Sequence, residues 1–326
     1  MSLRLGYYPG CSQSGTAAEY DISTRACCRA LGMELADVPN WTCCGSTPAH
    51  TVDHHLAGAL AARNLLQAEK AGLERVVTPC PSCLAALKTA DSHLADEAYK
   101  AGVEALLGRP APGPVDCQST LQALFEHIGP EGVKARVKRP LTGLRVATYY
   151  GCILNRPPGL MAFDDPENPV AMDRLLEACG ATVVDFPFKT ECCGAAFGMP
   201  RLDVMQRLSA RILDMAESVG ADVIAVACPL CQMNLDLRRG QVNAASGRDI
   251  RLPVPYFTQL MGLALGLPEA ELCLPKLVLP LEPALAAAQQ REAAGRAEAQ
   301  ARAAAKAAKN GTPRSEPVCK EDAPCA

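Results

Sequence analysis

Several features that would quickly assign a function are missing from this sequence. Its 326 residues carry a formal net charge of −3, so there is no basic excess of the kind that binds nucleic acid. The best candidate for a membrane span, Phe257 to Leu267, is stopped by Pro268 and is far shorter than the roughly 20 residues that a spanning helix needs. We therefore expect neither a nucleic-acid partner nor a membrane span.

Common cofactor-binding motifs are also missing. The chain contains no GxGxxG, no GxxxxGK[ST] and no C-x2-C-x2-C-x3-C-P, and so has no obvious nucleotide, flavin or cubane iron–sulfur site. No signal peptide is expected, because Ser2 to Tyr8 already has the pattern of a strand, and the cysteine count of 17 is odd. These points favour a cytoplasmic protein with reduced thiols.

Cysteine is abundant instead, and ten of the cysteines follow one spacing rule that occurs twice. Each copy has a lone cysteine, a Cys-Cys-Gly and a Cys-Pro-x-Cys, spaced C-x31-CC-x35-CxxC in the first copy and C-x39-CC-x34-CxxC in the second. The first set is Cys11, Cys43, Cys44, Cys80 and Cys83, and the second set is Cys152, Cys192, Cys193, Cys228 and Cys231. Adjacent cysteines cannot easily form a disulfide with each other, and CxxC is a common chelating turn. The pattern therefore predicts two soft-metal sites built from thiolates.

The residues around these cysteines repeat as well. The segment LRLGYYPGC that ends at Cys11 corresponds to LRVATYYGC that ends at Cys152, and the segments leading into each CCG and each CPxC correspond in the same way. An internal repeat of this length predicts two small domains of one fold. With 49% apolar residues, the chain can form two cores.

Periodicity predicts strands and helices in alternation within each half. This is typical of an α/β fold, here two duplicated parallel sheets with helices packed on them. The expected strands are Arg4–Tyr8, Met33–Val38, Arg75–Thr78, Arg145–Tyr150, Thr182–Phe186 and Val223–Ala227, and the expected helices are Thr16–Leu31, Val52–Ala71, Met172–Cys179 and Leu202–Val219. All ten repeat cysteines fall at or just after the carboxyl ends of strands, where the loops of a parallel sheet converge. We therefore expect the five cysteines of each set to meet.

We expect four segments along the chain. Residues 1–129 form the first cysteine module, 130–143 a basic linker, 144–268 the second module, and 269–326 an Ala-rich and polar tail that is partly helical or disordered. Beyond about Pro280 the tail has no apolar stripe, so we expect that part to add no core contact and to be dispensable for folding and for loading both metal sites. Its Cys319 and Cys325 match neither set, and their role stays open.

Five thiolates per set limit the choice of metal. Structural zinc and a cubane [4Fe–4S] cluster each take four protein ligands. A fifth thiolate therefore indicates a larger or open iron–sulfur assembly, or a site with a spare reactive thiol. Structural zinc and the packing of buried thiols remain as alternatives.

In these motifs the chain resembles the B subunit of heterodisulfide reductase, a family with two CCG modules of this form. The resemblance covers about Arg4 to Gly266, and the Arg156-Pro157-Pro158 that follows Cys152 adds to it. It implies that each module binds one noncubane [4Fe–4S] cluster through all five of its cysteines, and both sets are complete here. It also implies that electrons arrive from partners, a ferredoxin-like [4Fe–4S] C subunit and a flavin-containing A subunit.

The resemblance further implies an oxidoreductase that acts on sulfur groups. Cleaving a disulfide takes two electrons and an iron–sulfur cluster normally carries one, so two clusters facing one cleft could share the step. The substrate would be a disulfide of thiol cofactors or a lipoyl-type, protein-bound sulfur carrier, cleaved or, in reverse, formed. The composition of the tail hints at bacterial sulfur oxidation. The alternative is an electron-transfer or scaffold component of a lactate- or glycolate-oxidising type of complex.

No catalytic residue is expected beyond the cluster ligands, but some side chains are candidates for supporting roles. His50, His54 and His55 could pass protons to a product thiolate, or could simply begin a helix. Arg156 could pair with an anionic group of the substrate. Five further cysteines lack a counterpart in the other half and are expected to be small buried hydrophobes: Cys27, Cys28, Cys117, Cys179 and Cys273.

Overall fold

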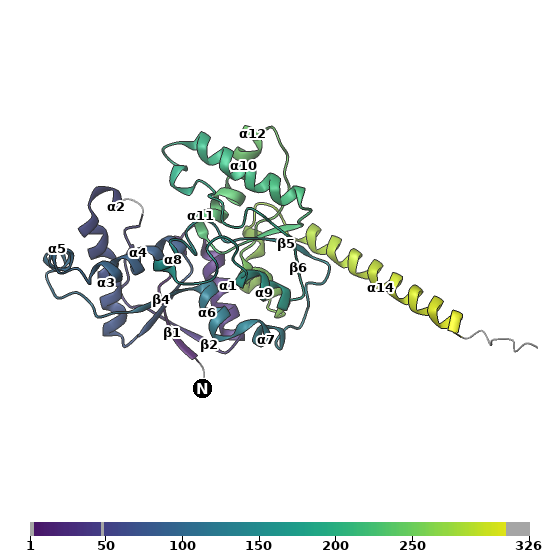
Figure 1. Cartoon of the computed structure of the whole chain (residues 1–326), viewed down its shortest axis with the longest axis horizontal. Helices are drawn as coiled ribbons and strands as arrows, with labels where there is room; N and C mark the ends of the chain where they lie inside the picture. The colour runs from purple at the N-terminus through teal and green to yellow at the C-terminus, as the bar shows by residue number, and fades with distance from the viewer. Residues whose placement is uncertain (1–2, 47–48, 311–326) are drawn as a thin grey trace, which may run out of the picture.

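The two halves of the chain build two separate parallel sheets, each flanked by helices (Figure 1). The structure, a computed structural model, describes residues 3–46 and 49–310. The first half contains β1 (Leu3–Tyr7), α1 (Ala18–Ala30), β2 (Met33–Asp37), α2 (Ala49–Val52), α3 (His54–Lys70), β3 (Arg75–Thr78), α4 (Pro81–His93), α5 (Glu97–Leu107), β4 (Asp116–Ser119), α6 (Thr120–His127) and α7 (Gly129–Lys134).

The second half repeats this plan with different helices. It contains β5 (Arg145–Tyr149), α8 (Pro158–Met161), α9 (Ala171–Ala178), β6 (Thr182–Val183), η1 (Ala195–Phe197), α10 (Leu202–Ser218), β7 (Val223–Val226), α11 (Pro229–Gln232), the π-helix η2 (Met233–Leu237), α12 (Arg239–Ser246) and α13 (Phe257–Ala264). The short 3-10 turns η3 (Glu269–Glu271) and η4 (Leu274–Lys276) lead to α14 (Glu282–Asn310).

Both sheets have the same strand order around their first strand. The first sheet is β2-β1-β3-β4 and the second is β6-β5-β7, and every pairing is parallel. The six strands and four helices expected from periodicity are present, with ends that differ by a few residues at most. The predicted α/β fold with two duplicated parallel sheets is confirmed.

Each sheet also has a fourth strand position that periodicity did not reveal. In the first sheet β4 occupies it, paired with β3. In the second sheet residues 252–256 run beside β7, whose N–H groups donate to Pro253 O and Pro255 O at 3.0 and 3.1 Å. Proline has no N–H to return such a bond, which is why this edge forms only a single bridge, between Val226 and Tyr256.

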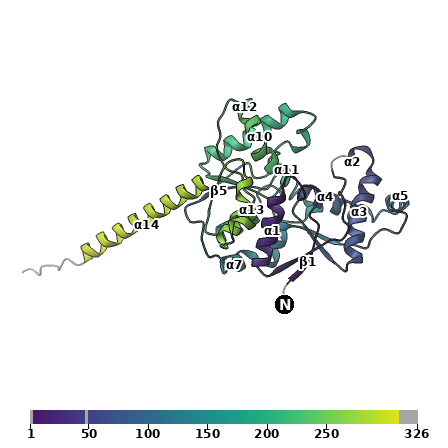
Figure 2. The ribbon, with the colours of Figure 1, turned by 180° about the vertical axis from the view of Figure 1, so that it is seen from behind.

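The two modules pack through a reciprocal arrangement of helices. α1 of the first half lies beside α13 of the second (Figure 2), and α9 of the second half contacts α6 and α7 of the first. The Tyr20 ring stacks on Tyr256 with centroids 4.1 Å apart, and the hydroxyls of Ser23 and Thr258 share a hydrogen bond of 2.7 Å. Because α1 and α9 follow the first strand of each sheet, and α6 and α13 follow the fourth, the interface repeats the internal symmetry of the sequence.

One apolar core continues through this interface. It combines Leu121 and Leu124 of α6 with Leu175 of α9 and Phe257 of α13. A second cluster, which includes Leu84, lies mostly in the first half and also takes in Met161 of α8. The division at residues 129, 143 and 268 stays a proposal, and the expected linker begins as the helix α7.

The C-terminal tail differs from expectation. α14 projects from the body of the protein (Figure 1), but its start is seated on the core, where Leu281 and Ala288 are buried. Arg291 donates to Gly143 O at 3.1 Å and pairs with Asp222. The expectation that the tail adds no core contact is wrong, because one leucine and a small alanine are enough to seat a helix end against a glycine.

Cys319 and Cys325 of the tail lie outside the described residues. None of the helices within residues 3–46 and 49–310 combines the length and apolar character that a bilayer crossing requires.

Candidate functional site

The ten repeat cysteines lie at the carboxyl ends of the first three strands of each half. Cys11 and Cys152 follow β1 and β5, and the two Cys-Cys pairs follow β2 and β6 through short loops. Cys80 and Cys228 end the segments after β3 and β7, and each immediately precedes a helix with proline at its first position. Proline suits that position because its φ is already helical and no N–H partner is needed there. The parallel sheets thus bring residues from distant parts of the sequence to one edge.

Within each set the thiols approach one another closely and in the same way. Cys44 Sγ lies 3.3 Å from Cys83 Sγ, and the equivalent atoms of Cys193 and Cys231 are 3.6 Å apart. The glycine of each CCG donates its backbone N–H to the sulfur of the first cysteine, at 3.5 Å in the first set and 3.3 Å in the second. The two sets are therefore repeated in contacts as well as in sequence.

Glycine before the lone cysteine of each repeat makes room for this arrangement. Gly10 and Gly151 have φ of +74° and +76°, and a Cβ on either would lie 3.0 Å from the sulfur of Cys83 or Cys231. An L-residue is strained at such φ values, and the added atom would crowd the thiol. The backbone therefore forms a close wall of each thiol set.

A buried tyrosine joins two ligand segments in each half. Tyr8 donates its hydroxyl to Thr42 O at 2.7 Å, and Tyr149 donates to Glu191 O at 2.7 Å. Thr42 and Glu191 each come directly before a Cys-Cys pair. Trp41 packs edge-on against Tyr8 with centroids 5.7 Å apart, so it shapes the surroundings of the first set, as its position suggests. These bonds tie the first strand of each sheet to its CCG loop.

Thiol–thiol contacts shift the pKa of some repeat cysteines toward the thiolate. The hydrogen bond with Cys83 lowers the pKa of Cys44 to about 7, and the one with Cys152 lowers the pKa of Cys192 to about 6. By contrast, burial raises the pKa of the non-repeat Cys28 to about 12. The same thiol–thiol contacts, together with burial, raise the pKa of the partner thiols Cys83 and Cys152, so only part of each set is shifted toward the thiolate form that binds a soft metal.

The non-repeat cysteines mostly behave as expected. Four of them are buried, and Cys273 is only half-buried, with its sulfur near Ala270 O. Burial also raises the pKa of Cys117 and Cys179 to about 12. The buried thiols are inert packing groups, and none of the described cysteines forms a disulfide.

The donor chemistry of both sets suits an iron–sulfur group. Within residues 3–46 and 49–310 no three His, Cys, Asp or Glu side chains are arranged so that they could hold a single metal ion. The fit is therefore judged from the donors and the space around them. Each set offers five free thiols, with a glycine rather than a side chain pressed against one of the sulfurs. Thiolate-only donors are the ligands that iron–sulfur clusters take.

A large cleft between the two halves brings residues of both repeats together. Its volume is about 1020 Å³. It is lined by Cys44 of the first set and by all five cysteines of the second set: Cys152, Cys192, Cys193, Cys228 and Cys231. Much of the remaining wall is apolar and small, with alanines of α3 and α4 on one side and Ala195, Ala196 and Met199 on the other. A ligand in this central cleft would reach thiols from both modules.

The two sets differ in their exposure. Cys11 and Cys43 of the first set are exposed, whereas the equivalent Cys152 and Cys192 are only partly exposed and line the central cleft. The first set therefore has an outer face toward solvent, which the sequence did not indicate.

The histidines divide differently from the sequence prediction. His50 and His54 line the central cleft, and so does His93 at the end of α4, which was not among the candidates. His55 is not part of the lining but stacks on Tyr99, which is, with centroids 5.2 Å apart. The helical spacing from the CPxC segment could have revealed His93, because residues 86, 89, 90 and 93 share one face of α4.

The arginine that lines the cleft is not the one that the sequence suggested. Arg156 is held by its own loop and by the segment before the second CCG: it donates to Pro166 O at 2.8 Å and to Thr190 Oγ1 at 3.0 Å, and it pairs with Glu167. The cleft-lining arginine is instead Arg238, for which the sequence carried no signal.

A buried network of charged and hydroxyl groups lies next to the segment that leads into Cys152. Lys189 pairs with Asp173, which also accepts hydrogen bonds from Thr148 Oγ1 at 2.7 Å and from the hydroxyl of Tyr150 at 2.8 Å. Tyr150 lines the central cleft two residues before Cys152. The network therefore fixes the backbone that leads into the lone cysteine of this set.

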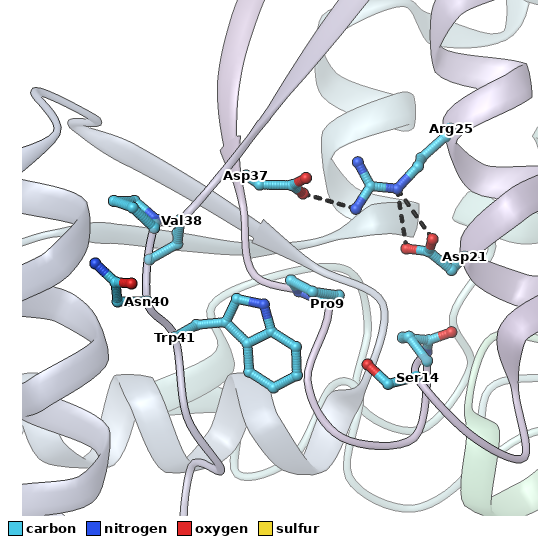
Figure 3. A pocket seen from close by; sticks show the side chains of 10 residues that line it. Pro9, Ser14, Asp21, Arg25, Asp37, Val38, Asn40 and Trp41 are labelled. Carbon is cyan, nitrogen blue, oxygen red and sulfur yellow. Dashed lines mark hydrogen bonds and ion pairs between the residues drawn. The ribbon is translucent and has the colours of Figure 1, made fainter.

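A smaller recess of about 380 Å³ lies beside Trp41 (Figure 3). It shares no lining residue with the central cleft. The Arg25 guanidinium in its wall is paired with Asp21 at 3.0 Å and Asp37 at 2.6 Å. Because these charges satisfy one another, the recess offers little to a charged ligand.

Comparison with known proteins places the fold and the repeats in context. Residues 5–88 and 146–236 each match the cysteine-rich domain family CCG. The chain is 34% identical to the 8-methylmenaquinol:fumarate reductase membrane anchor subunit of Wolinella succinogenes, over 83% of this chain and 95% of that one. It is 32% identical to the B subunit of a ferredoxin/F420H2-dependent CoB-CoM heterodisulfide reductase of Methanosarcina acetivorans, over 82% and 91% of the two chains.

Two further comparisons agree with these. The B subunit of a ferredoxin:CoB-CoM heterodisulfide reductase of Methanosarcina mazei is 33% identical over 81% of this chain and 89% of that one. The crystal structure of a hypothetical protein from Helicobacter pylori superposes with a TM-score of 0.68 at 12% identity, over 85% of this chain and 52% of that chain. The latter likeness concerns the fold alone.

Proposed function

The chain belongs to the family of two-module CCG proteins that includes the B subunit of heterodisulfide reductase, and on that premise we propose that it is the disulfide-cleaving component of an iron–sulfur complex. In reverse, the same protein would form the disulfide. The observation that carries the proposal is the central cleft, which thiols of both repeats line. A disulfide has two sulfurs, and a site with two soft centres at one cleft suits both of them.

The ten repeat cysteines would hold the cofactors. The first set would bind one noncubane [4Fe–4S] cluster and the second set another, each through five thiolates. When bound, two such clusters would each carry one electron, which together is what the cleavage of one disulfide requires. The apolar alanine walls of the cleft would exclude water from the reacting sulfurs.

The cleft histidines would complete the reaction. Cleavage of one disulfide to two thiols consumes two electrons and two protons. His50, His54 and His93 line the cleft and can deliver protons to product thiolates, since imidazole exchanges protons near neutral pH. We therefore assign them proton transfer rather than metal binding.

Electrons would enter through the exposed face of the first set. Cys11 and Cys43 are exposed there, so a partner protein could approach this cofactor site closely. We propose a ferredoxin-like [4Fe–4S] C subunit as that partner, itself supplied by a flavin-containing A subunit. The disulfide would belong to thiol cofactors or to a lipoyl-type carrier, as in bacterial sulfur oxidation.

The test is turnover of disulfides by the anaerobically purified, cluster-loaded chain with reduced methyl viologen as electron donor. Lipoamide and other small disulfides serve as substrates. Cys11→Ala and Cys152→Ala should each abolish thiol production, because one cofactor alone supplies half of the electrons. Cys273→Ala, a half-buried cysteine outside both sets, is the matched control and should keep full activity. Half of the activity remaining in Cys152→Ala would contradict the shared step.

A second candidate function is electron transfer without disulfide chemistry. It is favoured by the 34% identity to a membrane anchor subunit of a quinol:fumarate reductase and by the apolar walls of the cleft, which suit a quinol ring. In that case the loaded chain would oxidise a soluble menaquinol analogue when an oxidised redox dye is supplied as electron acceptor, and with reduced methyl viologen it would leave every disulfide of the panel intact. These two anaerobic assays therefore separate the two functions.

A further inference from the structure

We propose that Arg238 binds an acidic group of the ligand in the central cleft, so that the ligand has an apolar body and one carboxylate, sulfonate or phosphate. This inference deepens the proposed function, because it takes the cleft as the substrate site. It adds a charge to the description of that substrate, and it names the residue that recognises the charge.

A π-helical turn directs Arg238 into the cleft. After the second CPxC the chain leaves α-helical geometry at η2, and Arg238 N–H donates to Met233 O, five residues back, at 3.0 Å. This wider turn places residues five apart on one face, so Met233 and Arg238 both line the cleft. In an α-helix the residue after Met233 on that face would be Leu237, which is not part of the lining. Single π turns are found frequently at functional sites.

The guanidinium of Arg238 is held in place but not neutralised. Its Nη1 donates to Gly198 O at 2.9 Å, and a Cβ on Gly198 would lie 2.4 Å from the same nitrogen. Glycine at position 198 is therefore needed for this close approach. Among the described residues no carboxylate forms an ion pair with Arg238. The next residue, Arg239, differs because its guanidinium donates to three backbone carbonyls. The remaining N–H groups of Arg238 are free to bind an anion.

The charge of the surrounding wall favours an anion as well. No aspartate or glutamate is among the described residues that line the cleft, whereas His50, His54 and His93 lie on the opposite module. Between them much of the wall is apolar, with several alanines, Ile153, Leu230 and Met233. A ligand with an apolar body and an acidic group would bury its body against these walls and pair its acidic group with Arg238.

The first module lacks an equivalent of this arginine. Arg238 stands seven residues after Cys231, and the residue at the same distance from Cys83 is Ala90, in an unbroken α4. Both residues line the cleft. The charge therefore sits on one side of an otherwise repeated site, and it would orient an asymmetric ligand with its acidic end toward the second module.

A matched pair of probes tests this without any redox step. Calorimetry would measure the binding of 8-anilinonaphthalene-1-sulfonate and of N-phenyl-1-naphthylamine, which has a similar apolar body and no sulfonate, to the anaerobically loaded chain. Arg238→Gln should weaken binding of the sulfonate by about tenfold or more, as the loss of a charge-assisted hydrogen bond does, and leave the neutral probe unchanged. Arg238→Lys should keep part of the sulfonate affinity.

Two control variants locate the effect. Arg207→Gln removes an exposed arginine of α10 outside the cleft and should change neither affinity. Ala86→Phe fills the cleft wall and should weaken both probes. Equal losses for both probes in Arg238→Gln, an unchanged sulfonate affinity there, or sulfonate binding that Ala86→Phe leaves intact would each overturn the proposal. If the unmodified chain shows this probe pattern but turns over no disulfide, the result would count against the proposed function alone.

Discussion

Replacing Gly151 by alanine should empty the second thiol set while the chain stays folded. Gly151 has φ of +76°, and its added Cβ would lie 3.0 Å from Cys231 Sγ, so the thiol has to move by a few tenths of an ångström. Alanine in this left-handed conformation costs about 1–2 kcal/mol. Because domains of this kind are stable by about 5–15 kcal/mol, the fold should survive the substitution. The arrangement of the metal-binding thiols should not survive, because the displaced Cys231 sulfur is one of the five thiols of the second set.

The assay is iron and acid-labile sulfide per chain after anaerobic reconstitution, together with the thermal unfolding midpoint. Gly151→Ala should reduce the iron content from about eight to about four atoms per chain. Gly10→Ala, with φ of +74° and the same 3.0 Å approach to Cys83 Sγ, should give the same loss from the first set. Gly240→Ala is the matched control, since nothing lies within 4 Å of its added Cβ. Full iron content in both Gly10→Ala and Gly151→Ala would refute the reasoning that these glycines border the cofactor sites.

Three further outcomes follow from the structure. A chain that ends at Pro280 should lose about 2–4 kcal/mol of unfolding free energy in urea, because the buried start of α14 is removed, whereas a chain that ends at Arg296 should match the full-length protein. Asp173→Asn should cost about 3–5 kcal/mol, because it leaves the buried Lys189 ammonium without its carboxylate, and an unchanged urea midpoint would contradict this. Burial raises the pKa of Asp236 from 3.8 to about 6, so the folded state disfavours the carboxylate and the free energy of unfolding should fall as the pH rises between these values. Asp236→Asn should flatten that part of the stability curve, and an identical slope in both proteins would argue against the assignment.

The sequence predicted the sheets and the approach of some thiols within each set because both depend on local patterns. Strands such as β1 and β7 are short runs with clear ends, and each CCG or CPxC follows such an end directly or through a short loop. Parallel pairing then brings the loops together whatever the exact register. The contacts of Cys44 with Cys83, and of Cys193 with Cys231, agree with that expectation.

Features that depend on tertiary contacts were not predictable in this way. The edge segment at residues 252–256 contains two prolines, which obscure its strand pattern. The π turn at η2 has no residue signature, so the position of Arg238 in the cleft could not be read from α-helical spacing. The seat of α14 depends on the space beside Gly143, where a Cβ would meet Ala288 O at 2.4 Å. In each case distant parts of the chain decide the outcome.

The most direct test of the central claim is the metal and sulfide content of the anaerobic protein and of two ligand variants. We predict about eight irons with matching sulfide in the unmodified chain, and about half of each in Cys43→Ser and in Cys192→Ser, with the EPR signal of the other cluster retained. Stoichiometric zinc without inorganic sulfide in the anaerobically purified chain would contradict the account.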